Sequence, residues 1–308
     1  MDLTERDLLE IGLDVVAADD HMPGAHLRDR VLATTLAGPR RVDGAWADTA
    51  RRGLTPLAAF IKTASELMAM LDTLTTEEWS RPTQVEGASV RDLTVHLVGV
   101  ERYVLGQLGR GPRWPAPGRE DHYPMSRVAA ADVAAFEGPD VARAWWLAVL
   151  DVVAACGDAG PDAPAAYHHL DGTARGLMVI RTFELWTHDE DIRRAIGREL
   201  NLLDDARLGL MSGELMEVLA LGMALSGTTR PGRTARFEIT GSGAGAYDIA
   251  LAPGDPIGAP DITISVPAVD LCRLAANRQS AAALPVVVEG DRSLLEPVLV
   301  GAGAFAAD

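Results

Sequence analysis

The spacing of apolar residues changes once along this 308-residue chain, and that change constrains the fold more than any other feature. From Leu54 to about Leu225 apolar residues recur every three to four positions, which is the period of an amphipathic helix. After the loop TTRPGR (residues 228–233) they alternate with polar residues, as on a half-buried strand. We therefore expect an α+β chain, with a helical part followed by a smaller part that contains a sheet.

The helical part contains four segments with an apolar seam. The first begins near Leu54 and the second at Ser89. The third surrounds residues 141–152, and the fourth covers roughly residues 175–196. At the start of the second segment, Ser89 and Asp92 have the spacing of a capping pair. Four helices of this kind indicate a helical bundle with the seams facing a common core.

The last third of the chain predicts a small α+β domain. A long helix over residues 204–225 precedes three strands, within ARFEIT, YDIALA and ITISV. Pro267 then opens a helix, LPVVVEG (284–290) follows as a buried strand, and RSLLEPVLV (292–300) is the final helix, which gives a β-β-β-α-β-α order. The predicted domains are an N-terminal helical extension (1–52), a bundle (53–200) and the α+β domain (201–308).

Composition excludes several function classes. The 28 basic and 44 acidic residues give a net charge of −16, which argues against a nucleic-acid or anionic-membrane partner. The acidic N-terminus does not resemble a signal peptide, and no uninterrupted apolar run reaches the roughly 18 residues of a membrane span. Two distant cysteines indicate no disulfide framework, so we expect a cytoplasmic protein. The extension 1–52 is a candidate contact for a homodimer.

Glu184 and His188 are the first candidates for a functional site. A separation of four residues places them on one face of a helix, with Cβ atoms roughly 5–6 Å apart. His96 lies beside the seam of the second segment, and bundle metal sites are built from such inward-pointing carboxylates and histidines. Two histidines and a glutamate suit Zn²⁺ with an open position. Spacing alone favours a simpler interpretation, in which His96 hydrogen-bonds in the core and Glu184 pairs with Arg181 or His188.

The remaining candidates are weaker. The adjacent His168 and His169 are predicted to lie in a loop before the fourth helix, and three histidines in irregular segments receive no role: His21, His26 and His122. GSGAGA (241–246) connects two strands, which indicates a turn and not a phosphate-binding loop. Neither cysteine has a convincing base near it in the sequence, and no G-x-S-x-G motif is present.

Several of these segments together resemble one known family. VRDLTVHLVGVERYVLGQL (90–108), RTFELWTHDEDIRRAIGR (181–198), DLCRLAANR (270–278) and PVVVEGDRSLL (285–295) resemble the mycothiol-dependent maleylpyruvate isomerase family over about residues 54–308. The resemblance implies a DinB-like four-helix bundle followed by an α+β domain similar in shape to sterol-carrier domains. It also implies a low-molecular-weight thiol, mycothiol, as co-substrate.

The resemblance further implies particular site residues. The family binds a divalent metal, usually zinc, and the matching positions here are His96, Glu184 and His188. It makes the metal hypothesis the favoured one. Arg278 matches a family arginine near the active site, suited to a carboxylate on the substrate or thiol. Asp191 matches a recurrent acid, which would hold a ligand histidine or belong to an exposed DED run.

One departure bears on the reaction. Many relatives carry a Pro-Gly-Trp-like element before the second bundle helix, whereas this chain has VEGASV (85–90). We therefore favour a thiol S-transferase acting on another small electrophilic metabolite. A cis–trans isomerase of the maleylpyruvate type is the alternative enzyme. A non-catalytic metal- or ligand-binding protein is the alternative from another class, for which His168 or His169 would close the metal shell. A bundle that binds no metal and acts through partners of residues 1–52 is the third.

Overall fold

The computed structural model describes residues 54–85, 87–111, 122–167 and 170–304. The predicted extension 1–52, with His21 and His26, lies outside the described residues, as do His168 and His169. The described residues divide into two compact units, Thr55–Asn201 and residues 202–304.

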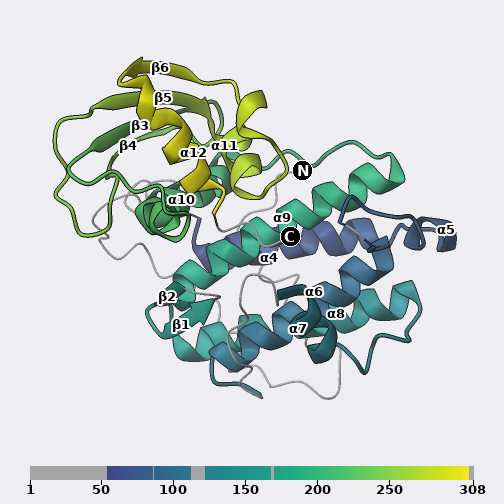
Figure 1. The fold of residues 1–308 in the computed structure, drawn as a ribbon. Coiled ribbons are helices and arrows are strands. Elements are labelled where there is room, and N and C mark those ends of the chain that lie inside the picture. The colour runs from purple at the N-terminus through teal and green to yellow at the C-terminus, as the bar shows by residue number, and fades with distance from the viewer. Residues whose placement is uncertain (1–53, 86, 112–121, 168–169, 305–308) are drawn as a thin grey trace. The chain divides into compact units, whose positions relative to one another are not determined.

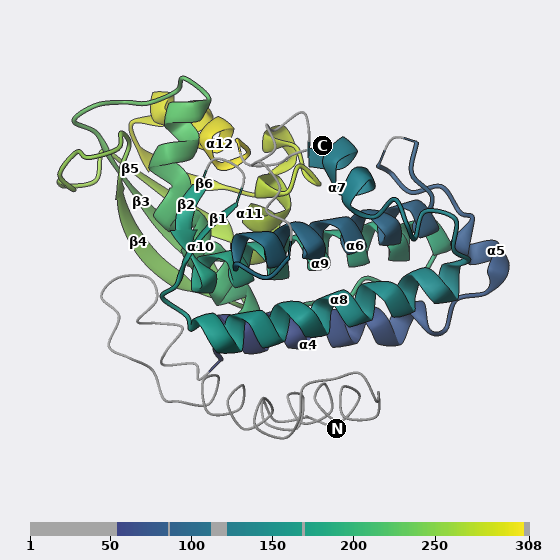
Figure 2. The ribbon, with the colours of Figure 1, turned by 90° about the horizontal axis from the view of Figure 1, so that it is seen from below.

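The first unit is built on four long helices, which confirms the predicted bundle. They are α4 (Pro56–Leu71), α6 (Val90–Gln107), α8 (Gly138–Ala159) and α9 (Ala174–Ile196), with the short α5 (Thr76–Trp79) between the first two. Figures 1 and 2 show them side by side, with α4 packed against α9 and α6 against α8. Their seams form a core that includes Phe60, Leu67, Leu97, Trp145 and Leu185.

Side-chain caps explain where these helices begin. Ser89 accepts a hydrogen bond from the Asp92 backbone N–H, and Asp92 accepts one from the Ser89 N–H, so the predicted capping box is present at α6. At α4 and α9, the side chains of Thr55 and Thr173 each accept a hydrogen bond from a backbone N–H of the first turn. At the other end of α9, Gly197 adopts the left-handed conformation (φ 72°) that terminates a helix cheaply.

Besides the four predicted helices and the short α5, the first unit has a strand pair and a helix that were not predicted. One is a hairpin of β1 (Pro164–Tyr167) and β2 (Leu170–Thr173). The other is α7 (His122–Ala129), so the assignment of His122 to an irregular segment was wrong. The backbone of α7 at Ser126 packs closely against Gly99 of α6. A Cβ at position 99 would lie 1.9 Å from the Ser126 carbonyl oxygen. Only glycine permits this close approach. The helix has eight residues, too few for apolar periodicity in the sequence to predict it.

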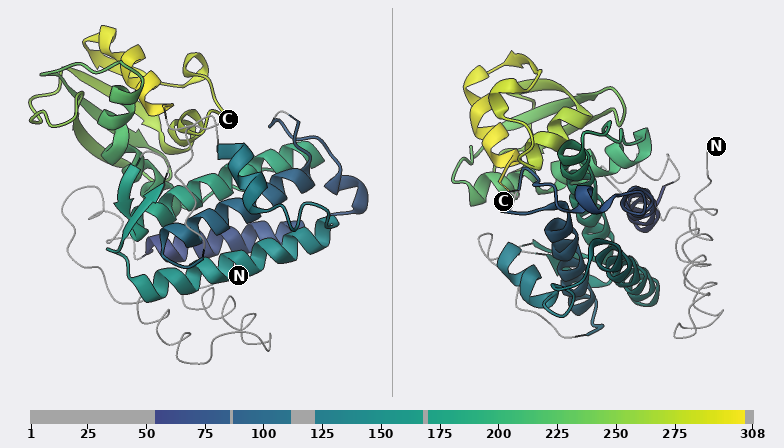
Figure 3. Two further views of the ribbon diagram at one scale, coloured as in Figure 1. Left: turned by 60° about the horizontal axis from the view of Figure 1, so that its bottom comes forward. Right: turned by 90° about the vertical axis from the view of Figure 1, so that its right-hand side faces the viewer.

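The second unit has the predicted β-β-β-α-β-α order after the long α10 (Asp205–Leu225). Strands β3 (Thr234–Thr240), β4 (Gly245–Ala250), β5 (Ile262–Pro267) and β6 (Val287–Gly290) form one sheet in the order β4-β3-β5-β6. Only β3 and β5 run parallel. The helices α10, α11 (Ala268–Ala275) and α12 (Leu295–Ala302) gather on one face of the sheet (Figure 3), and β3 alternates buried and exposed residues accordingly.

The prediction of a buried strand over residues 284–290 was wrong. Only Val287–Gly290 pair as a strand, and β6 is an edge strand with a partner on one side. Val287 is 66% exposed, while Leu284 before the strand is buried at 7%. The run of valines therefore reflects β propensity at an edge, where apolar side chains need not be covered.

Cysteine chemistry and membrane insertion find little support among the described residues. Cys156 and Cys272 are free and buried, and burial raises the pKa of Cys156 to about 12. Of the helices described, α10 alone has the length and mean hydropathy of a membrane span, but 61% of that window is buried within the protein. Core helices of soluble proteins have the same character.

Candidate metal centre

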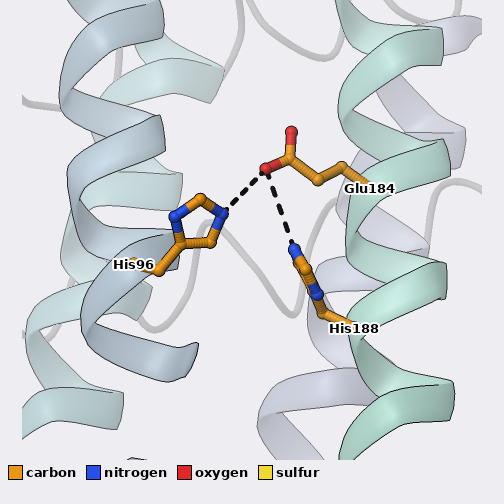
Figure 4. Close-up of side chains that lie close together, drawn as sticks. All are labelled: His96, Glu184 and His188. Carbon is orange, nitrogen blue, oxygen red and sulfur yellow. Dashed lines mark hydrogen bonds and ion pairs between the residues drawn. The ribbon is translucent and has the colours of Figure 1, made fainter. Parts of the chain in front are cut away.

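His96, Glu184 and His188 converge within the bundle. His96 projects from α6, and Glu184 and His188 project from successive turns of α9 toward it (Figure 4). Glu184 Oε1 lies 3.3 Å from His96 Nε2 and 3.9 Å from His188 Nε2. Both histidines are buried, at 1% and 8% exposure, whereas the Glu184 side chain is 15% exposed. The cluster is therefore largely screened from water, with the carboxylate as its most accessible member.

The other nitrogen of each imidazole has its own partner. Nδ1 of His96 lies 2.6 Å from Ser126 Oγ, and Nδ1 of His188 lies 3.2 Å from Asp191 Oδ2. These contacts orient the rings so that both Nε2 atoms face Glu184. A hydrogen bond donated by Nδ1, such as one to the Asp191 carboxylate, leaves the lone pair on Nε2, which is how metal-binding histidines are prepared.

The donor set fits a divalent metal. One donor atom from each residue lies within 4.8 Å of the other two. Ligands at about 2.0–2.1 Å around a tetrahedral Zn²⁺ are separated by roughly 3.4 Å, close to the shortest distance in the cluster. Two imidazoles and a carboxylate also match the ligand types of catalytic zinc sites that keep a position open.

A buried ion-pair network supports Glu184 from the other side. The Arg181 guanidinium contacts Glu184 Oε2 and also lies 2.7 Å from Glu101 Oε1. Arg181 and Glu101 are both 0% exposed. Burial raises the pKa of the Glu101 carboxyl, although Arg181 opposes this shift. Both contacts of the simpler sequence interpretation therefore exist, but Arg181 holds one oxygen of Glu184 while the other faces the histidines.

Asp191 lies beneath His188 and is not part of an exposed acidic run. The three consecutive acids Asp189, Glu190 and Asp191 are 2%, 1% and 0% exposed, so the interpretation of DED as a solvated segment was wrong. Arg193 pairs with Asp189 and Arg194 with Glu190. Asp191 instead accepts a 2.6 Å hydrogen bond from the Gln84 side chain, while its other oxygen contacts His188.

Arg278 belongs to the second unit. It follows α11, its backbone N–H donates to the Arg273 carbonyl, and its guanidinium donates to the Ala276 carbonyl at 3.0 Å. These local bonds place it at the end of the helix. Its predicted role toward substrate or thiol remains a prediction.

Sequence reasoning named Asp191 and Arg181 as partners of the ligand candidates, but it missed Ser126 and Glu101. Ser126 was missed because α7 itself was missed. Glu101 stood within an otherwise ordinary helical pattern, five residues after His96.

The four-helix bundle with its His/His/Glu cluster is an arrangement in which helical proteins can hold a metal ion, and comparison with known families gives a match over the bundle. Residues 60–193 match the family model described as the mycothiol maleylpyruvate isomerase N-terminal domain. Residues 60–193 are therefore similar to this family, in line with the resemblance seen in the sequence.

Two solved structures are also similar. A crystal structure of a mycothiol-dependent maleylpyruvate isomerase has 15% sequence identity and a TM-score of 0.49, over 75% of this chain and 91% of the other. A mutant of such an isomerase has 13% identity and a TM-score of 0.47, with the same coverage. No curated protein matches the chain. The similarity to the family rests on the sequence match over the bundle.

Proposed function

We propose that this protein is a metal-dependent enzyme that activates mycothiol for addition to a small electrophilic metabolite. The observation that carries the proposal is the convergence of His96 Nε2, His188 Nε2 and Glu184 Oε1. A divalent metal such as Zn²⁺ at these atoms would lower the pKa of a thiol and hold it as the thiolate.

The residues around the metal have separate tasks in this proposal. His96, Glu184 and His188 hold the ion, and Ser126 and Asp191 fix the orientation of the two imidazoles. The bundle core excludes water from the histidines, while the partly exposed Glu184 leaves a side for substrates to approach. Arg278 is proposed to bind a carboxylate of the substrate or of the thiol.

Two outcomes follow from the same first step. The thiolate forms a C–S bond with an electrophilic carbon of the second substrate. If a leaving group departs with its electron pair, or if the enolate formed by addition to a C=C bond takes up a proton, the product keeps the sulfur and the enzyme is an S-transferase. If the electrons of a C=C bond move to a conjugated carbonyl, rotation followed by C–S cleavage gives a cis–trans isomer. The VEGASV departure favours transfer, and the name of the matching family favours isomerisation.

A product analysis separates these outcomes. We would strip the protein with a chelator, restore Zn²⁺, and incubate it with mycothiol and either maleylpyruvate or a panel of epoxides and Michael acceptors. Mass spectrometry detects a thiol adduct, and NMR detects a changed double-bond geometry. We expect one of these products only from the restored protein. Absence of both would contradict the enzyme proposal and favour a metal- or ligand-binding protein.

The matched control is Thr187→Ala on the same helix. Thr187 is buried beside His188 and bonds only the Phe183 carbonyl through its hydroxyl among the hydrogen bonds seen in the described chain. We expect Thr187→Ala to keep the reaction and His96→Ala to lose it. Equal loss in both variants would indicate damage to α9 or the bundle and not removal of a metal ligand.

A further inference from the structure

Beyond the three donor atoms, the most informative feature of the cluster is that Arg181 contacts Oε2 of the Glu184 carboxylate, whereas Oε1 faces the histidines. All three guanidinium nitrogens of Arg181 are engaged: Nη1 with Glu184 Oε2, and Nη2 and Nε with Glu101 at 2.7 and 3.4 Å. Glu184 Oε1 is turned to the opposite side, toward both histidines (Figure 4). The two oxygens of one carboxylate therefore have different tasks.

Net stability does not explain this network. Burying an ion pair removes its charges from water, and replacing such a pair by apolar residues is often neutral or stabilising. Arg181 and Glu101 are fully buried, so their pair carries this full cost. The guanidinium has a fixed planar fork, which suits it to hold two carboxylates in a set geometry. What the network provides is a fixed orientation of Glu184.

We propose that Arg181 is a positioning residue that makes Glu184 a one-oxygen metal ligand. This inference rests on the proposed metal centre. A carboxylate that keeps Oε2 on a guanidinium offers only Oε1 to an ion, whereas a released carboxylate can chelate through both oxygens. With Arg181 in place, the protein supplies three donor atoms and leaves a position open for the thiol. Without it, a fourth protein donor competes for that position.

The test uses Arg181→Met, with metal affinity and coordination as readouts in place of activity. We would load wild type and variant with Co²⁺ and record the visible absorption, whose intensity and position report coordination number. We expect weaker absorption in the variant, typical of a higher coordination number. Competition with a chelator should show Zn²⁺ affinity lowered by about tenfold to a hundredfold, the usual effect of removing a group that supports a ligand.

Controls separate positioning from folding. Arg193→Met removes another arginine of α9, whose partner Asp189 is not a donor in the cluster, and should leave the cobalt spectrum unchanged. If Arg181→Met does not fold, Glu101→Leu/Arg181→Met removes the whole pair without leaving Glu101 buried alone. Arg181→Lys retains a cation but lacks the fork, so it should restore folding but not the full wild-type spectrum.

The outcomes are distinguishable. A wild type that binds neither Co²⁺ nor Zn²⁺ would overturn the metal centre itself. A wild type that binds metal, beside a folded Arg181 variant with the same spectrum and affinity, would overturn the role of Arg181 alone. A lower melting temperature with unchanged metal binding would show that the network is only structural.

Discussion

Helices α9 and α10 have similar lengths, 23 and 21 residues, but α9 buries several charged side chains, whereas the buried residues of α10 include one, Arg207. The buried residues of α9 include Arg181, His188, Asp189, Glu190 and Asp191. Those of α10 are mainly leucines and methionines, such as Leu208, Met211 and Leu215. The hydrophobic effect alone explains α10, because buried apolar area stabilises a fold without regard to direction.

The charges of α9 require another explanation. Each buried charge is costly unless a partner is near, and on α9 the partners are present: Glu101 for Arg181, Arg193 for Asp189, Arg194 for Glu190 and Gln84 for Asp191. Such an arrangement adds little net stability but fixes positions. The difference between the helices indicates that α10 builds a core, whereas α9 holds charged side chains in fixed positions.

Breaking the ion-pair network of α9 should have the largest effect on stability. Arg181→Ala leaves Glu101 buried opposite no cation, and we expect unfolding to become easier by about 3–5 kcal/mol. Urea unfolding of the full chain, followed by circular dichroism, measures the change. A loss below about 1 kcal/mol would mean that water or rearrangement compensates the buried carboxylate.

A cavity in α10 should cost somewhat less. Leu215 is 4% exposed, and Leu215→Ala should destabilise the second unit by roughly 2–5 kcal/mol through lost burial and the cavity left behind. In contrast to the changes on α9, it should not alter metal binding per folded chain. The same unfolding experiment with a Co²⁺ spectrum checks both statements, and an altered spectrum would contradict the separation of roles.

The carboxylate of Glu214 on α10 differs from the paired acids of α9. Oε2 of Glu214 is buried with no hydrogen-bond partner among the described residues, and burial raises its pKa from 4.5 to about 7. Because the folded state holds this proton more tightly than the unfolded state, stability should fall as pH rises from about 4.5 to about 7. Glu214→Gln should remove that slope and stabilise the protein at pH above 7 by up to about 3 kcal/mol.

The pH dependence of unfolding in urea provides the measurement. Wild type and Glu214→Gln should differ most at high pH and converge at low pH, where Glu214 is protonated in both states. Parallel profiles at all pH values would show that Glu214 does not titrate abnormally.

Gly99 links packing to the site and should have the smallest of these effects. Gly99→Ala places a Cβ against the Ser126 backbone, which should cost about 1–3 kcal/mol and displace α7. Since Ser126 contacts His96, metal affinity should fall even in the folded variant. Chelator competition tests this, and an unchanged affinity would show that Ser126 is not needed to orient the ring.

Features that depend on residue spacing within a single segment could be predicted from the sequence. Apolar period and capping residues predict the bundle helices, the Ser89 cap and the order of strands and helices along the second unit. The structure confirms them. The spacing of Glu184 and His188 placed them on one face, but it could not show that His96 would lie 3.3 Å from Glu184. The bundle pattern suggested a metal site at these three residues, the family resemblance made that hypothesis the favoured one, and the roles of the residues remain predictions.

The remainder depends on contacts between distant segments. The Ser126–His96 contact joins residues 30 apart, Arg181–Glu101 joins residues 80 apart, and Gln84–Asp191 joins residues 107 apart. No local period reports such pairs. The edge position of β6 is likewise a property of the sheet, since LPVVVEG reads the same at an edge or in the middle.

Metal content of the purified protein, measured by elemental mass spectrometry, tests the central claim most directly. Wild type and Thr187→Ala should each carry about one divalent metal per chain, and His188→Ala should carry almost none. A wild type without metal that Zn²⁺, Co²⁺ or Ni²⁺ cannot reconstitute would contradict the account. His96, Glu184 and His188 would then be a buried hydrogen-bonded cluster of the bundle core.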